Sequence, residues 1–291
     1  MATLPQTINT NIASLNAQRS LSMTQSSLAT SMQRLSSGLR VNSAKDDAAG
    51  LAIAERMSAQ VRGMNVAIRN ANDGISLAQT AEGSLGKVAD ALQRMRELAV
   101  QSANDTNSAG DKNSLDKEFG ELAKEIQRVL GATTFNGKHV LGSQAGSMQF
   151  QVGANTTAND TIDITTVDLT TDVSVTTIAG TDNTGASRSV IDATASTAAI
   201  HTVIDSIDTA LDTVNSQRAV LGASQSRFDS VISVLQVSVE NQTAARSRIM
   251  DADFAAETAN LSRSQILQQA GNAMVAQANQ LPQQVLKLLQ G

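Results

Sequence analysis

The strongest constraint in this sequence is a single heptad register that runs for about 40 residues, from Ile200 to Val239. Apolar residues fill most of its two seam positions, and only Arg218 and Gln225 interrupt the stripe. Such a seam must be covered by other helices, because its side chains are apolar and lie along one face. The pattern therefore predicts one long helix that packs against further helices. The stripe consists of Ile200, Val203, Ile204, Ile207, Leu211, Val214, Leu221, Phe228, Ile232, Leu235 and Val239.

Two more stripes with heptad spacing lie over residues 88–99 and 115–129, with the polar stretch NDTNSAGD between them. Proline, which breaks helices, occurs only at Pro5 and Pro282. The chain has five Phe and neither Trp nor Tyr, so a core built on large aromatic side chains is not available to it. These features favour an extended, mainly α-helical protein packed from aliphatic side chains.

Each end of the chain carries one amphipathic segment without a nearby partner in the sequence. Isolated helices of this kind are marginally stable in water. The two segments must therefore pair with each other, pair with other copies, or stay disordered until a partner arrives. The apolar residues that we predict to serve self-assembly are Leu28, Met32, Leu35, Leu267, Met274, Leu281, Val285 and Leu288.

The middle of the chain follows a different pattern. From Phe135 to Thr170 the apolar period falls towards two, which predicts two or three short strands separated by turns. Residues 171–196 are rich in Thr, Ser, Gly and Asp, and we expect them to form a surface loop.

Near the N-terminus, Gly38 is placed to end one helix through a left-handed cap. Ser43 is placed to cap the next helix, with Asp46 and Asp47 favouring its positive end.

No credible active site is visible. The chain has no cysteine, and its two histidines, His139 and His201, lie in no metal-binding motif. The stretch GATTFNGKH has the wrong spacing for a phosphate-binding loop and is better explained as a turn from helix to strand. We therefore expect no enzyme activity, no cofactor and no bound metal. An enzyme with a metallopeptidase insert is disfavoured because the motif HExxH is missing.

Charge and hydropathy also argue against nucleic-acid-binding and membrane-spanning proteins. Residues 151–200 contain six Asp and one basic residue, which accounts for the whole net charge of −5. An acidic middle with balanced arms argues against nucleic-acid binding. No segment approaches the roughly 18 apolar residues of a membrane span. The first residues, MATLPQTINTNI, lack the features of a cleavable signal peptide.

Several long motifs at both ends resemble those of the bacterial flagellins. They are INTNIASLNAQRSL, RLSSGLRVNSAKDDAAGLAIAERM, LQRMRELAVQSAN, TFNGKHVL, SRIMDADFAAETANLSRSQILQQAG and AQANQLPQQVLKLL. The resemblance covers residues 1–170 and 197–291. It implies a mainly α fold, with long helices in an antiparallel coiled-coil hairpin and a small β-hairpin region in the middle of the chain. Residues 1–42 and 246–291 would form an inner coiled-coil layer, with a connector near 34–46. Residues 43–170 and 197–245 would form a helical rod with β-hairpins, and residues 171–196 a short variable surface loop.

The resemblance also implies a function and partners. The chain would be a structural subunit that self-assembles into the extracellular flagellar filament, after export without a cleavable signal. A hook–filament junction protein is the alternative. Implied partners are further copies of the chain, an export chaperone at the C-terminal segment, the filament cap, hook-associated proteins and a host Toll-like receptor. The family's receptor-contacting pattern maps onto Arg94, Leu98 and Glu118.

Overall fold

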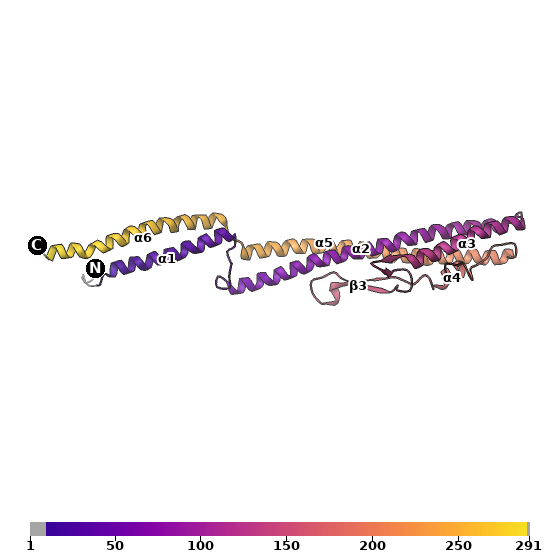
Figure 1. The fold of residues 1–291 in the computed structure, drawn as a ribbon, viewed down its shortest axis with the longest axis horizontal. Coiled ribbons are helices and arrows are strands. Elements are labelled where there is room, and N and C mark those ends of the chain that lie inside the picture. Colours follow the sequence, from indigo (N-terminus) through magenta and orange to yellow (C-terminus); the bar gives the residue numbers. More distant parts are fainter. Residues whose placement is uncertain (1–9, 290–291) are drawn as a thin grey trace. The chain divides into compact units, whose positions relative to one another are not determined.

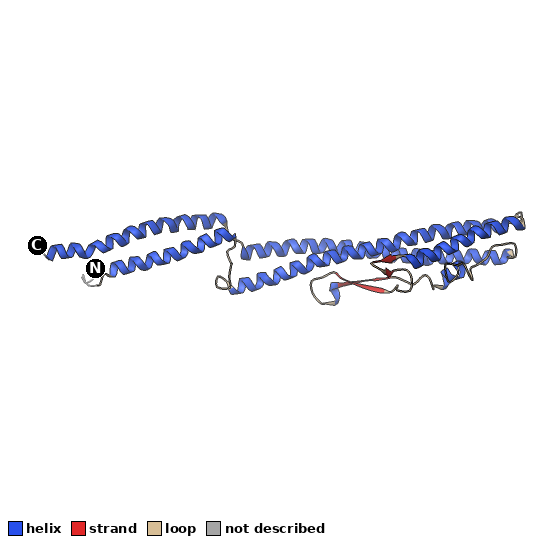
Figure 2. Ribbon diagram, in the orientation of Figure 1, coloured by secondary structure: helices blue, strands red, loops and turns tan. Residues whose placement is uncertain are grey.

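The computed structural model describes residues 10–289, and for residues 281–289 it describes the backbone alone. Long helices make up most of the described chain, and the strands are short (Figures 1 and 2). This confirms the prediction of a mainly α-helical protein with a small β region in the middle of the sequence. In chain order the elements are α1 Ile12–Ser37, α2 Ala48–Ser102, α3 Ala109–Ala132, β1 Thr134–Phe135, β2 Lys138–His139, β3 Ser147–Gln151, the 3₁₀ turn Ala158–Asp160, β4 Thr161–Thr165, α4 Val173–Ala179, α5 Thr197–Met250 and α6 Phe254–Leu289.

The chain divides into two compact units. We call residues 10–59 and 241–289 the terminal unit, and residues 60–240 the central unit. Both α2 and α5 contribute residues to each unit. The assignment of residue ranges to an inner layer and an outer rod of a filament stays a prediction.

The core of the central unit lies where α2, α3 and α5 meet. Every seventh residue of α5 from Ile200 to Leu235 is buried, which confirms the heptad register. The ion pairs Arg96–Asp208 and Arg218–Glu82 join α2 to α5, and their order along the two helices shows that these run antiparallel. The largest fully buried side chains of this core include Phe119, Phe228, Leu85, Leu92, Met95, Leu98, Ile126, Leu130 and Ile164.

Two antiparallel hairpins follow α3, in the region where the period of two predicts strands. Strands β1 and β2 are joined by Asn136 and Gly137, both with positive φ (49° and 79°), as a tight hairpin turn requires. Strands β3 and β4 pair in a register that sets Phe150 opposite Ile162. The inward side chains of this second hairpin join the helical core. GATTFNGKH is thus the turn from helix to strand that the sequence predicts.

Residues 171–196, which we call the strap, are not the surface loop that their composition predicts. Val175 and Ile178 of α4, and Ile191 beyond it, are fully buried in the central core. Gln127 of α3 donates a hydrogen bond to the Gly180 carbonyl at 2.5 Å. The prediction is wrong because it counts only how few apolar residues this segment contains, whereas three of those few are fully buried.

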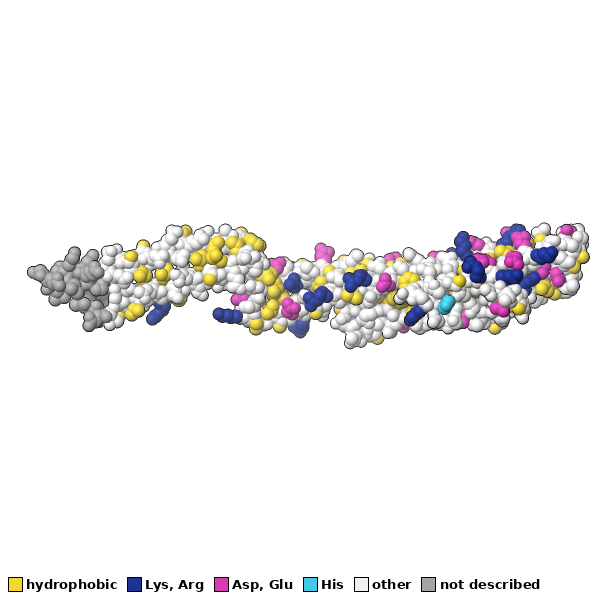
Figure 3. All heavy atoms as spheres, in the orientation of Figure 1, with side chains coloured by type: hydrophobic (Ala, Val, Ile, Leu, Met, Phe, Trp, Pro, Cys, Tyr) yellow, Lys and Arg dark blue, Asp and Glu magenta, His cyan; other side chains and the backbone are white. Residues whose placement is uncertain are grey.

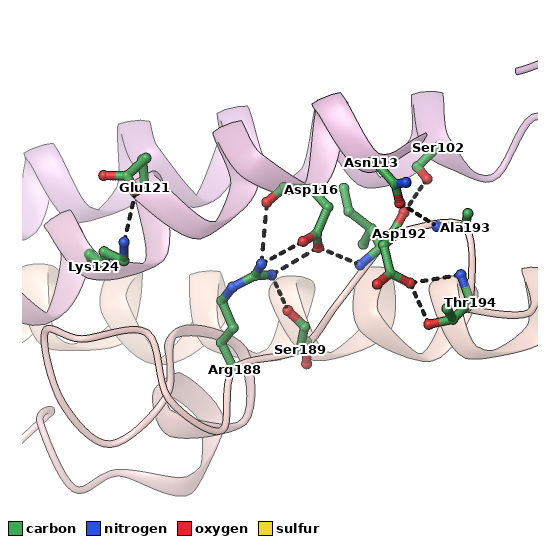
Figure 4. A network of polar contacts seen from close by, with 11 residues as sticks. Ser102, Asn113, Asp116, Glu121, Lys124, Arg188, Ser189, Asp192, Ala193 and Thr194 are labelled. Carbon is green, nitrogen blue, oxygen red and sulfur yellow. Dashed lines mark hydrogen bonds and ion pairs between the residues drawn. The ribbon is translucent and has the colours of Figure 1, made fainter. Parts of the chain in front are cut away.

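One ion pair anchors the strap to α3. Arg188 donates to both carboxylate oxygens of Asp116, at 2.9 and 2.5 Å, and Asp116 also accepts the backbone N–H of Ile191 at 2.9 Å (Figure 4). Side-chain exposure is only 16 % for Arg188 and 14 % for Asp116. Gly120 has no room for a side chain, because an added Cβ would lie 2.9 Å from the Arg188 Nε. The strap is therefore an integral part of the central unit.

The connector after α1 is only partly as predicted. Gly38 ends α1 in the left-handed conformation (φ 70°), and its N–H donates to the Arg34 carbonyl, which confirms the predicted cap. Ser43 does not cap α2. That helix begins at Ala48, and Asp47 accepts the N–H of Gly50 at 2.7 Å, so Asp47 is its cap. The carboxylate of Asp46 instead accepts the N–H and hydroxyl of Ser43, which closes a turn before the helix.

Candidate assembly surface on the terminal helix pair

The first and last helices of the chain lie side by side in the terminal unit (Figure 1). They run antiparallel, because Asn11 contacts Ala278 at one end and Arg34 contacts Glu257 at the other. The two terminal segments therefore pair with each other, which is one of the three options that the sequence leaves open. We call α1 and α6 together the terminal pair.

The seam of the terminal pair is built from small and polar side chains. The buried residues of the pair are Ser14, Ser31, Glu257, Ser264 and Ala278. The side chain of Leu21 packs against Gly271, where an added Cβ would lie 3.2 Å from the Leu21 Cδ1. Few large apolar side chains are therefore covered where α1 and α6 meet.

Hydrogen bonds and caps fix the ends of this pair. The Ser14 hydroxyl donates to the Asn279 Oδ1, and the Asn11 amide donates to the Ala278 carbonyl, both at 2.7 Å. Asn11 also caps α1 by accepting the N–H of Ser14. Asp253 caps α6 by accepting the N–H groups of Ala255 and Ala256. These contacts hold the two helices together without much apolar burial.

The large apolar residues of the pair face outwards instead. Of the predicted assembly residues, Met32, Leu267 and Met274 are exposed by 57 %, 51 % and 62 %. Leu28 and Leu35 are half-buried. The side chains of Leu281, Val285 and Leu288 lie outside the described residues. The sequence does not predict several further exposed apolar residues of the pair, which are Ile12, Leu15, Met23, Phe254 and Ile266.

Two shallow grooves run along the terminal pair and share Ser20, Thr24 and Leu267 in their walls. One groove is largely apolar and contains Leu21 and Met274. The other is lined mostly by hydroxyl groups. Shallow grooves beside exposed apolar side chains are suited to receive side chains of another helix.

Charged residues are scarce on the terminal pair. The 26 residues of α1 and the 36 of α6 contain five, namely Arg19, Arg34, Glu257, Arg263 and Lys287. In the view of Figure 3 the terminal pair displays apolar patches and few charged side chains, whereas charges of both signs gather on the central unit. Depletion of charge and exposure of Met and Leu are the composition of an interface core.

The residues predicted to contact a receptor lie in the central unit, where α2 and α3 meet. The Arg94 Nε donates to Glu118 at 2.9 Å, and another nitrogen of the guanidinium contacts Glu97 at 2.8 Å. The hydrogen bonds to Glu97 and Glu118 raise the pKa of Arg94 above its ordinary value. Leu98 does not share this surface, because its side chain is 1 % exposed and belongs to the core. A spacing of four residues puts side chains on neighbouring rows of a helix, and here only one row faces solvent.

The described part of the chain contains neither a candidate membrane span nor a candidate metal site. Among residues 10–289, no helix is both long and apolar enough to cross a membrane. No three acidic, histidine or cysteine side chains within that range are grouped to hold a metal ion.

Sequence reasoning missed the residues that form the seam of the terminal pair. Ser14, Ser31 and Ser264 are polar, so an apolar-stripe search discards them. The usable signal is the shortage of charge along both helices, together with Gly271, which permits close approach.

Comparisons with known proteins agree with this geometry. A family model described as the bacterial flagellin N-terminal helical region matches residues 8–145, and one described as the bacterial flagellin C-terminal helical region matches residues 204–289. A flagellin of Halalkalibacterium halodurans is 46 % identical over 282 residues, which cover 97 % of this chain and 99 % of that protein. A flagellin of Bacillus subtilis is 41 % identical over 317 aligned residues, with the same coverage.

A solved structure shares the fold. A flagellar hook-associated protein from Vibrio parahaemolyticus superposes with a TM-score of 0.60 over 71 % of this chain and all of that one, at 13 % identity. This likeness concerns the fold alone. Because two family models and full-length relatives match both arms of the chain, the chain belongs to the bacterial flagellin family and is a structural subunit of the flagellar filament.

Proposed function

We propose that copies of this chain propagate the filament through the terminal pair. The supporting observation is that Met32, Leu267 and Met274 are more than half exposed on a surface almost free of charge. Burial of such side chains between copies is favourable because apolar surface leaves water. Contacts between unlike faces that do not close into a ring extend as an open helix.

A double substitution of Leu267 and Met274 by serine tests this surface. About half of each side chain is already covered in one copy, so its burial between copies contributes about 1–1.5 kcal/mol, or about tenfold per residue. We expect the protein concentration needed for polymerisation to rise about 100-fold. The measurement is electron microscopy and sedimentation of purified full-length chain after salting out, with filament seeds added.

The matched control is Val173→Ser, because Val173 is 77 % exposed but lies on α4 of the central unit. It should polymerise like the unchanged chain. If the double variant also polymerises normally, the terminal pair is not the propagating surface. If even the unchanged chain adds to seeds without propagating, the hook–filament junction role replaces the filament role.

We further propose that an export chaperone binds the C-terminal segment before assembly, and that the filament cap and hook-associated proteins receive the exported chain. The exposed apolar side chains of α6, among them Ile266 and Leu267, support a chaperone that shields this helix. On this proposal the chain reaches the extracellular filament through the flagellar export apparatus.

A host Toll-like receptor is proposed to bind the central unit at Arg94 and Glu118. Their side chains are 49 % and 48 % exposed, and by the resemblance the family's receptor-contacting pattern maps onto both residues. Buried Leu98 would support this surface from below.

We expect Arg94→Ala to weaken activation of receptor-expressing reporter cells by about 10–100-fold, because a charged hydrogen bond contributes about 1.5–3 kcal/mol. Arg128→Ala, an equally exposed arginine on α3, is the control and should leave activation unchanged. Equal activation by the unchanged chain, Arg94→Ala and Arg128→Ala would show that Arg94 does not contact the receptor.

A further inference from the structure

Among the described methionines, three stand out because they are more than half exposed on the terminal pair. Met23, Met32 and Met274 are exposed by 60 %, 57 % and 62 %. By contrast, Met64, Met95 and Met250 are at most 6 % exposed. The chain has no cysteine, tryptophan or tyrosine, so methionine is its main target for mild two-electron oxidation.

Two of these methionines also line the grooves of the terminal pair. Met274 lies in the apolar groove with Leu21 and Gly271, and Met23 lies in the hydroxyl-lined groove with Ser27. Unbranched methionine side chains fill irregular gaps at interfaces because they are flexible and polarisable. Of the methionines that the structure describes, those most accessible to an oxidant therefore lie on the surface that we propose to be covered on assembly.

We infer that Met23, Met32 and Met274 form an oxidation-sensitive site that decides whether a copy can join the filament, with a peroxide as the oxidant. This inference rests on the proposed function. The sulfur atom attacks one peroxide oxygen, the O–O bond breaks, and an S=O bond forms. With hydrogen peroxide, the second oxygen leaves as hydroxide and takes up the proton of the attacked O–H group to become water, so sulfur loses two electrons and the peroxide gains them.

The product changes the surface from apolar to polar. A sulfoxide carries a strong hydrogen-bond acceptor, and burial of such a group without a donor is costly. Each oxidised methionine that becomes buried between copies should raise the concentration needed for polymerisation by about tenfold. A chain already in the filament is protected, because the neighbouring copies cover the same sulfur atoms. Oxidation therefore acts on free chains and spares assembled ones.

The test compares purified full-length chain with and without a brief hydrogen peroxide treatment. Peptide mass spectrometry locates added oxygen, and seeded sedimentation measures polymerisation. We expect Met23, Met32 and Met274 to gain oxygen first in free chains and to be protected in preformed filaments. Methionine sulfoxide reductases added to the free oxidised chain should restore polymerisation. A triple variant, Met23→Leu, Met32→Leu and Met274→Leu, keeps apolar side chains of similar volume but has no sulfur at these positions. Its polymerisation after the treatment should therefore equal that of the same variant left untreated.

Several results would overturn the inference. One is normal polymerisation of chains that carry oxygen on all three methionines. Another is equal loss of polymerisation in the treated triple variant, which would assign the effect to other residues such as Met57 or Met148. Equal oxidation of free and assembled chains would also contradict it. Failure of the untreated chain to polymerise would instead count against the proposed function.

Discussion

Replacement of Phe228 by alanine should lower the free energy of unfolding of the central unit by about 3–5 kcal/mol. Phe228 is fully buried on α5, and its ring meets that of Phe150 edge-on, with the centroids 5.7 Å apart. The truncation removes this aromatic pair and leaves a cavity between α2, α5 and β3. The cavity cannot collapse easily, because the rest of the seam holds the two helices apart.

The measurement is unfolding by urea, monitored through the hydrogen–deuterium exchange of peptides from the central unit. Val234→Ala is the control, because Val234 is on the same helix but 66 % exposed, and it should change stability by less than about 0.5 kcal/mol. A loss below about 1 kcal/mol for Phe228→Ala would mean that this part of the seam is not tightly packed.

Gly74 offers a second test of the same contact. A Cβ at this position would lie 2.8 Å from the ring of Phe228, so Gly74→Ala should destabilise the folded chain. In the Phe228→Ala background the ring is gone, and the same substitution should become stabilising by up to about 1 kcal/mol, the helix propensity gained over glycine. A double-mutant cycle measures this reversal of sign. Additive effects would show that the two residues do not touch.

Loss of the Asp116 carboxylate should destabilise the central unit by about 3 kcal/mol, because it leaves the mostly buried Arg188 guanidinium without its counter-charge and the Ile191 N–H without its acceptor. Asp116→Asn should cost less than Asp116→Ala, since an amide oxygen still accepts one of these donors. Exchange of the strap amides should speed up in both variants. Asp90→Ala is the control, because the Lys87–Asp90 pair is largely exposed and contributes little.

The effect of Asp116 should also depend on pH. Burial raises the pKa of this carboxyl, but the hydrogen bonds from Arg188 and Ile191 and the charge of Arg188 outweigh burial, so the pKa lies below its ordinary value of 3.8. A carboxyl whose pKa is lowered on folding stabilises the folded state above the unfolded pKa, and this contribution is lost as the pH falls through the folded pKa. The difference between the unchanged chain and Asp116→Ala should therefore be constant near neutral pH and shrink below pH 3.8. A difference that grows in acid would contradict this account.

Regular repetition made most of the fold predictable. Ile200, Ile207 and Phe228 share one heptad position, and the repeat carries enough information to place a long buried seam. Gly38 was predictable because few residues other than glycine adopt its backbone conformation easily. The helix cap at Asp47 was not, since Ser43, Asp46 and Asp47 are all good caps and only the folded chain selects one.

The strap and the receptor-contacting residues show where sequence patterns lose information. Helix α4 has seven residues, too few for a periodic stripe, and its burial depends on Asp116 and Gln127 of a distant helix. Leu98 follows Arg94 by four residues, but tertiary packing buries Leu98 and leaves Arg94 half exposed, which a spacing of four does not predict. The apolar residues that we propose for assembly were visible in the sequence. Their exposure was not predictable, because an apolar-stripe pattern does not indicate a seam built mainly from serines.

The serine-rich seam has a consequence for how the ends of the chain respond to mass action. A helix pair that covers few of its own large apolar side chains gains little stability from its internal contacts. Anything that binds the ordered pair but not the unfolded one stabilises it in proportion to the logarithm of its concentration. If other copies are that ligand, the stability of α1 and α6 is a property of the solution as well as of the chain, and the two ends become more ordered as subunits accumulate.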